Sequence, residues 1–182
     1  MRIIAGEKRG LVLRTVTFEG FRPTLDRVKE SLFGILAPHI RDARVLDLFA
    51  GSGALSFEAV SRGAASALML DSDPRAAKVI EQNLAKTGFA DRCRFTLADF
   101  EAAGKTVARG MQFDLVFADP PYDAGFAQRV LNHLRTVDLL APEGLLSLEM
   151  SRKEMAGLDI TGYEVLRPKR FGFTFVWIMR RV

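Results

Sequence analysis

From residue 44 onward, short apolar runs alternate with helical patterns, and this alternation restricts the fold more than any other feature of the sequence. Strand-like runs occur at residues 44–49, 67–70, 93–97, 113–118 and 144–149, with helical patterns at about 53–62, 74–87, 99–109 and 124–136. Apolar strands joined by helices are typical of a parallel sheet with both faces covered. The last two runs, 163–166 and 171–179, have no helix between them and predict an antiparallel hairpin at the sheet edge. The sequence therefore predicts an α/β fold with a doubly wound, mostly parallel sheet of seven strands.

The residues before this pattern are predicted to form an N-terminal extension, residues 1–37, on a core of residues 38–182. A short β-hairpin is expected from residues 2–6 and 10–14, and Thr24 is a plausible N-cap for a helix from about Leu25 to Leu36. Pro38 would end that helix. The chain of 182 residues has the length of one domain, so we expect a single domain.

The composition excludes several classes of protein. A single cysteine, Cys93, cannot form an internal disulfide, and the two histidines, His39 and His133, are far apart, so no metal site is expected. The sequence has no apolar run near the ~18–20 residues of a membrane span and no apolar leader. We therefore expect a cytoplasmic protein without a membrane partner.

The net charge of +4 is unevenly distributed along the chain. Residues 1–30 carry seven Lys and Arg against four Asp and Glu, and residues 167–182 carry five Arg and Lys and no acid. Basic ends of this kind are either solvated surface or a surface that binds a polyanion.

A glycine turn follows the first expected strand, within the segment from Asp47 to Leu55. Gly51 and Gly53 allow a tight turn and the close approach of a ligand to the next helix. An ordinary strand-to-helix turn would explain these glycines equally well. Ligands of open α/β sheets bind beyond the carboxyl ends of the strands, however, so the residues after the neighbouring strands are informative.

Acidic residues follow the second and third expected strands. Asp71 comes 20 residues after Gly51, where a carboxylate can bind both ribose hydroxyls, and Asp99 is placed to meet an adenine amino group. Taken singly, Asp73 and Asp99 are more simply explained as helix N-caps. Together with the glycine turn, the acids predict a ligand of the adenosine type. Its other expected contacts are Phe49, Ala50, Ser72 and Phe100.

Two residues distinguish this ligand from a dinucleotide. Ser56 stands where a dinucleotide site has its third glycine, and the carboxylate of Asp47 would repel a pyrophosphate. The same carboxylate suits the cationic amino-acid end of S-adenosyl-L-methionine, which has no phosphate. Residues 45–53 also resemble the first motif of class I methyltransferases. S-adenosyl-L-methionine is therefore the predicted cofactor.

The fourth expected strand ends in Asp119, Pro120, Pro121 and Tyr122. A rigid strand exit would explain the prolines but not the acid and the aromatic residue. The Asp119 carboxylate and the Pro120 carbonyl can accept the two N–H bonds of an exocyclic amine and direct its lone pair, while Tyr122 stacks on the ring. The segment matches the [Asp/Asn]-Pro-Pro-[Tyr/Phe/Trp] motif of amino-methyltransferases, which gives the reaction type but not the substrate.

Nearly the whole chain resembles the bacterial small-subunit rRNA guanine-N2 methyltransferases, the RsmD family. The matching stretches are residues 1–6, 9–10, 22–24, 26–30, 32–33, 45–55, 61–64, 113–117, 119–122 and 169–172. The resemblance implies methylation of the N2 amine of one guanine in 16S rRNA, presented on an assembling small ribosomal subunit. The chain departs from the family at Phe173, which follows Gly172 where a polar residue is usual.

This resemblance gives the basic ends a role, because phosphate contacts position RNA without reading its sequence. The residues expected to bind RNA around the crevice are Arg2, Lys8, Arg9, Arg14, Arg22, Thr24, Arg27, Lys29, Lys169 and Arg170. Alternatively, Arg22 and Thr24 close over the carboxylate of the cofactor. The aromatic residues expected in the core rather than on a binding surface are Phe113, Phe117, Phe173, Phe175 and Trp177.

Other functions fit parts of this pattern. A protein glutamine N5-methyltransferase shares the Pro-Pro motif but usually has asparagine at the position of Asp119 and has no reason for basic ends. A nucleic-acid adenine N6-methyltransferase also shares the motif, although 182 residues leave little room for the target-recognition domain of a DNA enzyme. A non-catalytic RNA-binding assembly factor with the same fold would not require Asp119 or Gly51.

Overall fold

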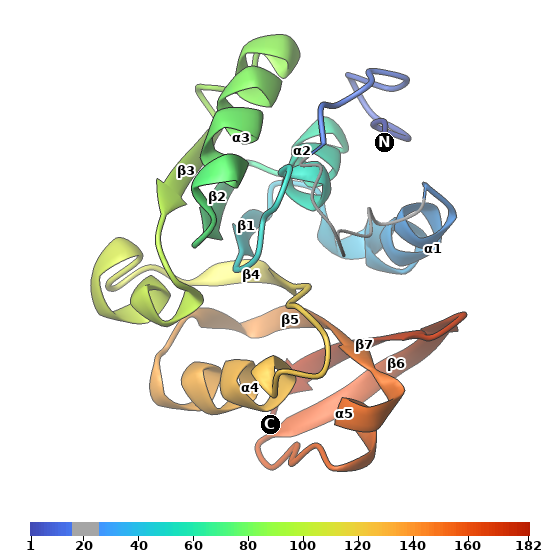
Figure 1. Cartoon of the computed structure of the whole chain (residues 1–182), viewed down its shortest axis with the longest axis vertical. Helices are drawn as coiled ribbons and strands as arrows, with labels where there is room; N and C mark the ends of the chain where they lie inside the picture. The colour runs from blue at the N-terminus through green and yellow to red at the C-terminus, as the bar shows by residue number, and fades with distance from the viewer. Residues whose placement is uncertain (16–25) are drawn as a thin grey trace.

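The computed structural model describes residues 1–15 and 26–182, and its central feature is one sheet of seven strands. In chain order the strands are β1 (Arg44–Asp47), β2 (Ser66–Asp71), β3 (Cys93–Leu97), β4 (Phe113–Ala118), β5 (Leu140–Ser151), β6 (Tyr163–Phe171) and β7 (Thr174–Arg181). Their order across the sheet is β3-β2-β1-β4-β5-β7-β6. The strands from β3 to β5 pair in parallel, whereas β7 is antiparallel to both β5 and β6. The predicted doubly wound sheet with an antiparallel hairpin at one edge is confirmed (Figure 1).

Helices cover both faces of the sheet (Figure 1). One face carries α1 (Asp26–Leu36), α2 (Ala54–Ser61) and α3 (Pro74–Thr87), and the other carries α4 (Phe126–Thr136) and the short α5 (Arg152–Ala156). A 3-10 turn, η1 (Ala37–His39), follows α1. None of the helices in the described ranges combines the length and the apolar composition that crossing a membrane requires.

The sequence reading was wrong about two segments on the second face. Residues 99–109, expected to form one helix, form a 3-10 turn, η2 (Phe100–Ala102), followed by a π-helical turn, η3 (Ala103–Val107). A glycine inside a helix lowers its stability, and Gly104 packs so closely that an added Cβ would stand 2.5 Å from the Cβ of Val137. The helix α5 was not predicted, because five residues are too few for a helical period to show in the sequence.

Each face has its own apolar core. On the first face, Leu32, Phe33 and Leu36 of α1 belong to one buried cluster with Val45 of β1 and Ile178 of β7. Ile3 and Leu13 of the N-terminal segment belong to the same cluster. The N-terminal segment and α1 therefore share a core with the sheet.

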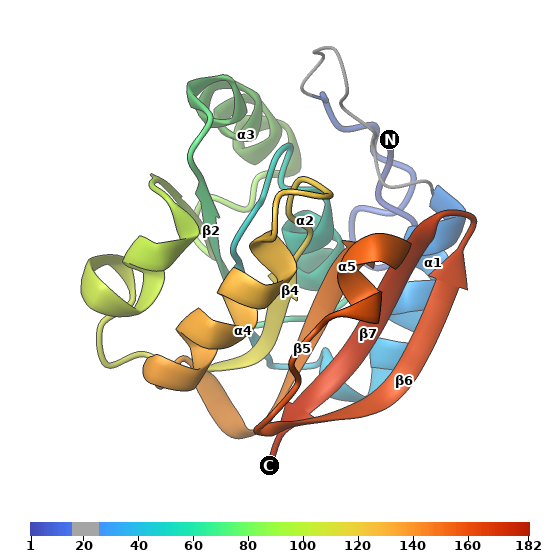
Figure 2. The same cartoon turned by 60° about the horizontal axis from the view of Figure 1, so that its bottom comes forward.

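The N-terminal segment forms the predicted hairpin between residues 1–3 and 10–13, where Arg2 is bridged to Val12 and three main-chain hydrogen bonds of 2.8–3.0 Å join the two sides. Side chains of the helices beneath it also fix its main chain. The carboxylate of Glu58 on α2 accepts the N–H of Ile4 at 2.7 Å, and Asn83 on α3 accepts the N–H of Arg14 at 2.8 Å. The segment consequently lies along α2 and α3 (Figure 2).

The strand order reverses between β1 and β4, because β2 and β3 extend the sheet on one side and β4 and β5 on the other. Residues Val45 to Asp47 pair in parallel with Leu115 to Phe117. The segments that follow β1 and β4 therefore leave the same edge of the sheet, at the switch point where open α/β sheets bind ligands.

Candidate active site

The glycine turn after β1 has the tight geometry that its sequence predicts. Gly51 and Gly53 have φ angles of +55° and +76°, a region that favours glycine, and an added Cβ at Gly53 would stand 2.5 Å from the ring of Phe57. The N–H of Gly51 donates to Oδ2 of Asp71 at 2.7 Å, and the N–H of Asp73 donates to Oδ1 at 2.8 Å. Asp71 thus fixes the turn after β1 and the exit from β2. Each of its oxygens has a further lone pair for a ligand hydroxyl.

Asp47 is the last residue of β1 and is almost completely buried, with 1% of its surface exposed. Its Oδ2 accepts the hydroxyl of Ser56 at 2.9 Å, while Oδ1 is buried without a hydrogen-bond partner among the described residues. Burial raises the pKa of Asp47 to about 7, against the opposing hydrogen bonds from Ser56 and the main chain of Phe49. A carboxylate oxygen of this kind fits a cationic ligand group, because an ammonium would supply the missing partner.

Asp99, the acid after β3, caps the helical turn that follows it, as the simpler interpretation predicts. Asp99 accepts the N–H of Glu101 at 2.9 Å, as Asp73 accepts that of Arg75 at 2.8 Å. Asp99 is exposed at the same sheet edge and retains acceptor capacity.

The other residues expected beside a cofactor differ in how accessible they are. Phe100 is 1% exposed and packs against Phe49 with ring centroids 5.1 Å apart, so a ligand could reach only its main chain. Phe49 is half-buried, Ser72 is exposed and Ala50 is buried with its N–H bonded to the carbonyl of Leu70. The expected cofactor residues are thus brought together around the ends of β1, β2 and β3.

The segment after β4 places Asp119 and Tyr122 in a cluster of polar side chains. The Tyr122 hydroxyl donates to a carboxylate oxygen of Glu149 and lies 2.8 Å from Oγ1 of Thr174. Asp119 shares a hydrogen bond with the Glu149 carboxyl group. Pro120 is buried and Pro121 exposed, so the chain turns away from the sheet directly after Asp119.

Burial raises the pKa of Glu149, and burial together with the Glu149 charge raises the pKa of Tyr122. Two hydrogen-bonded carboxyl groups hold a proton between them, because two adjacent negative charges in a buried site repel each other. In this cluster Asp119 can accept an N–H of an amine. Glu149, the second carboxyl group, can keep the shared proton when Asp119 does so.

Sequence reasoning missed Glu149 and Thr174. Glu149 ends the fifth predicted strand, so the argument applied to Asp71 and Asp99 could have identified it. Thr174 had no such signal, since its contact with Tyr122 joins residues 52 positions apart.

The predicted RNA-binding residues at the N-terminus fall into two groups. Arg2, Arg14 and Arg27 are exposed, and Arg14 is held by Asn83, whose amide also donates to the carbonyl of Ser52 in the glycine turn at 2.9 Å. The N–H of Lys8 instead donates to Oγ of Ser61 at 3.0 Å, at the opposite end of α2 from Gly53, and Arg9 is exposed. The main chain of Lys8 is therefore distant from the glycine turn, and RNA binding by Lys8 and Arg9 stays a prediction.

Lys29 was expected to bind RNA, and this prediction was wrong. Its side chain is completely buried, with Nζ 3.0 Å from Oε2 of Glu58, and it also donates to the carbonyl of Arg2. Arg62 contacts the other Glu58 oxygen at 2.6 Å. Lys29 on α1 therefore links the N-terminal segment to α2 through its contacts with Arg2 and Glu58. Arg22 and Thr24 lie outside the described residues.

At the other end of the chain, Lys169 and Arg170 are exposed on β6, as an RNA-binding role requires. Phe113 and Phe117 are buried as predicted, and Phe175 and Trp177 pack partly buried against the second core. Phe173 contradicts the prediction, because it is 84% exposed. It stands at the tip of the β6–β7 hairpin, where an alternating strand pattern no longer places side chains inside.

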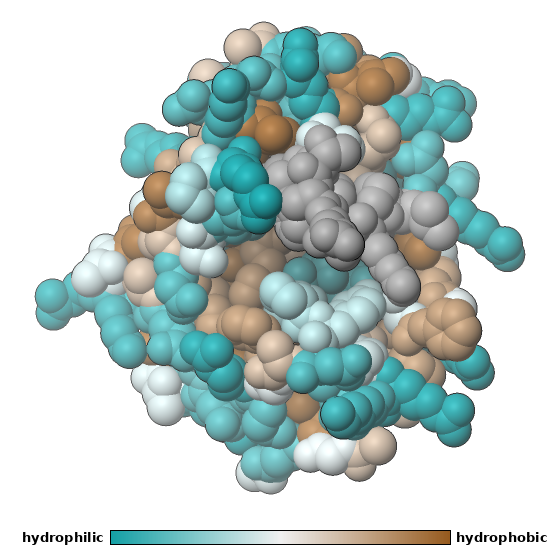
Figure 3. Space-filling model, in the orientation of Figure 1, coloured by the Kyte–Doolittle hydropathy of each residue, from teal (hydrophilic) through white to brown (hydrophobic). Residues whose placement is uncertain are grey.

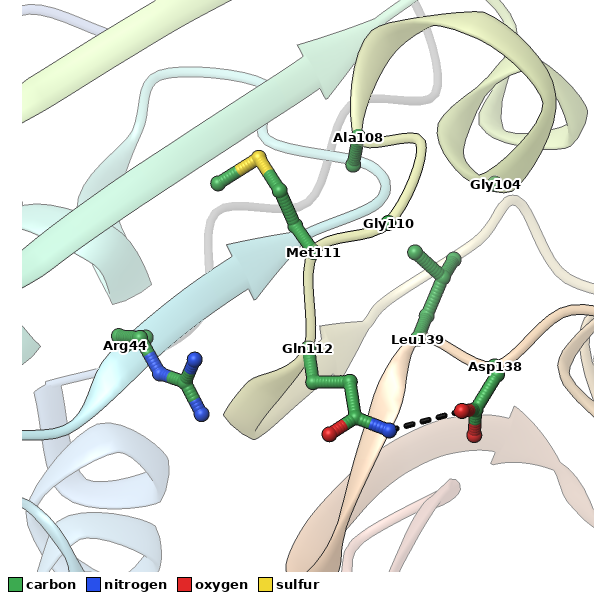
Figure 4. A pocket seen from close by; sticks show the side chains of 8 residues that line it. All are labelled: Arg44, Gly104, Ala108, Gly110, Met111, Gln112, Asp138 and Leu139. Atoms are coloured by element: carbon green, nitrogen blue, oxygen red, sulfur yellow. Dashed lines mark hydrogen bonds between the residues drawn. The ribbon is translucent and has the colours of Figure 1, made fainter.

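A cavity of about 430 Å³ lies elsewhere, at the amino end of β4 (Figure 4). Met111, Gln112, Asp138 and Leu139 line it, and the Gln112 amide donates to Asp138 at 2.8 Å. This is the opposite sheet edge from Asp119. Residues 1–15 and 26–182 also contain no group of three or more His, Cys, Asp or Glu side chains able to hold a metal ion.

Comparison with known proteins shows to which family this chain belongs. The family model described as "Conserved hypothetical protein 95" matches residues 1–180. The chain is 40% identical over 151 residues to ribosomal RNA small subunit methyltransferase D of Escherichia coli strain K12, which covers 82% of this chain and 74% of the relative. The Haemophilus influenzae protein of the same name is 36% identical over 176 residues, covering 94% and 89%.

Solved structures agree with these relationships. The structure described as "Putative methyltransferase yhhF from Escherichia coli" superposes with a TM-score of 0.86 at 36% identity, covering 100% of this chain and 97% of that one. A hypothetical protein of Thermus thermophilus superposes with a TM-score of 0.82 at 27% identity, covering 100% and 99%. The chain therefore belongs to the family of ribosomal RNA small subunit methyltransferase D.

Proposed function

We propose that this protein transfers a methyl group from S-adenosyl-L-methionine to the N2 amine of a guanine in 16S rRNA. The observation that carries the proposal is the common sheet edge of the glycine turn and Asp119, on either side of the switch point between β1 and β4. The relatives named above are rRNA methyltransferases of the small subunit, which supports the substrate class. We place the reaction in the cytoplasm, on an assembling small subunit.

The residues around β1 and β2 fit the proposed cofactor. The unpartnered Oδ1 of Asp47 would bind its ammonium group, Asp71 its ribose hydroxyls, and Asp99 its adenine amino group. Phe49, Ala50, Gly51, Gly53, Ser72 and the main chain of Phe100 would complete the cofactor contacts. When bound, the cofactor supplies a methyl group on a positively charged sulfur.

The residues after β4 would prepare the amine. The amide-like N2 amine of guanine is a weak nucleophile, because its lone pair is delocalised into the ring. The Asp119 carboxylate and the Pro120 carbonyl would accept its two N–H bonds and turn the lone pair toward the methyl group. The methyl carbon would exchange its bond to sulfur for a bond to N2, which leaves neutral S-adenosylhomocysteine, and one N–H proton would pass to the Asp119–Glu149 pair and from there to water. Tyr122, held by Glu149 and Thr174, would stack against the base.

Basic side chains would hold the RNA around this edge. Arg2, Arg14 and Arg27 near the N-terminus and Lys169 and Arg170 on β6 are all exposed, and we assign the RNA phosphates to them. The face seen in Figure 3 is largely hydrophilic, with apolar side chains exposed between the hydrophilic ones. Contacts between basic side chains and RNA phosphates release counterions, so the affinity for RNA should fall as the salt concentration rises.

The proposal is tested by nucleoside mass spectrometry of 16S rRNA from cells with the gene, without it, and without it but complemented by the Asp119→Ala variant. We expect one N2-methylguanosine to disappear on deletion and to stay absent with the variant. Restoration by the variant would favour a non-catalytic assembly factor. Loss of N6-methyladenosine instead would identify an adenine enzyme. An unchanged set of nucleosides would contradict the proposal.

A further inference from the structure

The tip of the β6–β7 hairpin presents an aromatic side chain to solvent. Phe173 is 84% exposed, whereas Phe171 and Phe175 on either side of it are partly buried. Gly172 has a φ of +62°, which allows the two strands to turn within two residues. Single exposed apolar side chains are common on protein surfaces, so exposure alone assigns no partner. What distinguishes Phe173 is its position beside the candidate active site.

The hairpin places Phe173 beside the candidate active site. Thr174, the next residue, pairs with Ser151 of β5 and with Phe171 of β6. The hydroxyl of the same Thr174 lies 2.8 Å from the Tyr122 hydroxyl. Consecutive Cα atoms are about 3.8 Å apart. The Cα atom of Phe173 is therefore within one residue's length of Thr174, which belongs to the polar cluster with Asp119 and Glu149.

The charges around Phe173 indicate the chemistry of its partner. Arg167, Lys169 and Arg170 are exposed on β6, and residues 167–182 include no acid. The Arg170 guanidinium donates to the carbonyl of Gly172 at 2.9 Å and lies 5.7 Å from the ring centre of Phe175, so its charge lies at the tip of the hairpin. One exposed ring among cationic side chains suits a nucleobase with its phosphates better than the larger apolar patch of a protein partner.

We propose that Phe173 inserts into the rRNA and stacks on a base next to the methylated guanine, which stabilises that guanine outside its stack. This inference rests on the proposed function. A base within folded RNA has to be unstacked before its amine can reach Asp119, and an aromatic side chain that occupies or covers the vacated position lowers the free energy of the open state. Phe173 would thus be a positioning residue, and Tyr122 would hold the extruded base.

The test compares three variants with the wild type on small ribosomal subunits and on 16S rRNA that lack the modification. Phe173→Ser removes the ring, and Phe173→Trp keeps an aromatic surface. Met111→Ser is the matched control, because Met111 is 46% exposed and lies by the cavity at the opposite sheet edge. We expect Phe173→Ser to lower kcat/KM about tenfold or more. The Trp variant and the control should stay within about threefold, and all should bind S-adenosylhomocysteine alike.

A second measurement reports unstacking directly. After the methylated guanine has been mapped, 2-aminopurine is placed at the neighbouring position of an RNA fragment, and its fluorescence is followed on binding. We expect the wild type and Phe173→Trp to change the fluorescence and Phe173→Ser to leave it close to that of free RNA.

The outcomes separate this inference from the proposed function. An active wild type with an equally active Phe173→Ser variant would overturn the role of Phe173 alone. A Phe173→Ser defect that tryptophan does not repair would overturn stacking as its cause. A wild-type protein that neither methylates nor binds rRNA would overturn both proposals.

Discussion

The two halves of the sheet hold their acidic residues in different ways. In the half formed by β1 and β2, main-chain N–H groups fix Asp71, and Asp47 keeps an oxygen without a partner among the described residues. In the half formed by β4, β5 and β7, the carboxyl groups of Asp119 and Glu149 are hydrogen-bonded to each other. The Tyr122 hydroxyl contacts Glu149 and the hydroxyl of Thr174.

We infer from this difference that the two halves of the sheet contribute to different steps of the reaction. Main-chain donors cannot rotate away, so the first half is preorganised for a ligand that binds in one fixed pose. Side-chain hydrogen bonds can be exchanged, so the second half can release Asp119 to a substrate amine while Glu149 keeps its hydroxyl partners. The first half should therefore govern cofactor affinity, and the second half should govern turnover.

The largest expected effect is that of Asp119→Ala. Alanine offers no oxygen to accept an N–H of the amine and cannot take up its proton, so kcat should fall by roughly 10²–10⁴-fold. Affinity for S-adenosylhomocysteine, measured by calorimetry, should stay within about threefold. A parallel loss of affinity and turnover would mean that the two halves are not separate.

Asp71→Ala should produce the reverse pattern. Removing this carboxylate leaves the N–H groups of Gly51 and Asp73 without their acceptor and deprives the ribose of its partner. We expect affinity for S-adenosylhomocysteine to fall roughly 10- to 100-fold, from hydrogen bonds to a charged group of about 1.5–3 kcal/mol. The matched control is Asp73→Ala, which removes a helix N-cap and should lower the free energy of unfolding by about 1 kcal/mol. Equal affinity losses in both variants would assign Asp71 a structural role only.

Asp47→Asn should change a pH dependence. Because the pKa of Asp47 in the folded protein is raised to about 7, binding an ammonium group at lower pH has to release its proton. Cofactor affinity should therefore rise with pH between 5.5 and 7, by at most tenfold per unit, and the dependence should be lost in the variant.

The same raised pKa has a second consequence, for stability without a ligand. Between the unfolded pKa, about 4, and the folded pKa of about 7, the folded state keeps a proton that the unfolded state has released. The free energy of unfolding should thus fall as pH rises across this window, and Asp47→Asn should remove that contribution. Wild-type affinity that does not vary with pH would contradict an ammonium contact at Asp47.

The smallest effect is expected for Tyr122→Phe. The ring for stacking remains, but the hydroxyl that donates to Glu149 is lost. One hydrogen bond of this kind contributes about 1 kcal/mol, so kcat should fall about fivefold with cofactor affinity unchanged. A loss as large as that of Asp119→Ala would show that the hydroxyl, rather than the ring, is the important part of Tyr122.

The strands along the chain and the doubly wound sheet could be predicted because apolar runs, glycines and strand-end acids are local signals. The family comparison confirms the predicted family, whereas the roles of Asp47, Asp71 and Asp119, chosen by the same signals, stay predictions. Contacts between distant residues left no such signal. Lys29 looked like a surface cation, because only the folded chain brings Glu58 within 3.0 Å of it.

Phe173 shows a different limit of sequence reasoning. Its neighbours follow a strand pattern in which every aromatic residue looks like core, and only the position of the turn at Gly172 exposes it. The irregular segment of residues 100–107 escaped prediction for a similar reason, since its helical pattern does not reveal the close packing of Gly104 on Val137.

The most direct test of the account is a single-turnover reaction with S-adenosylmethionine that carries a deuterated methyl group, on small subunits lacking the modification. Digestion and mass spectrometry then identify the labelled nucleoside and its amount. We predict one deuterated N2-methylguanosine per subunit with the wild type and none with Asp119→Ala at equal cofactor occupancy. Label on another nucleoside or on protein, or equal labelling by the variant, would contradict the meeting of cofactor and guanine amine at this sheet edge.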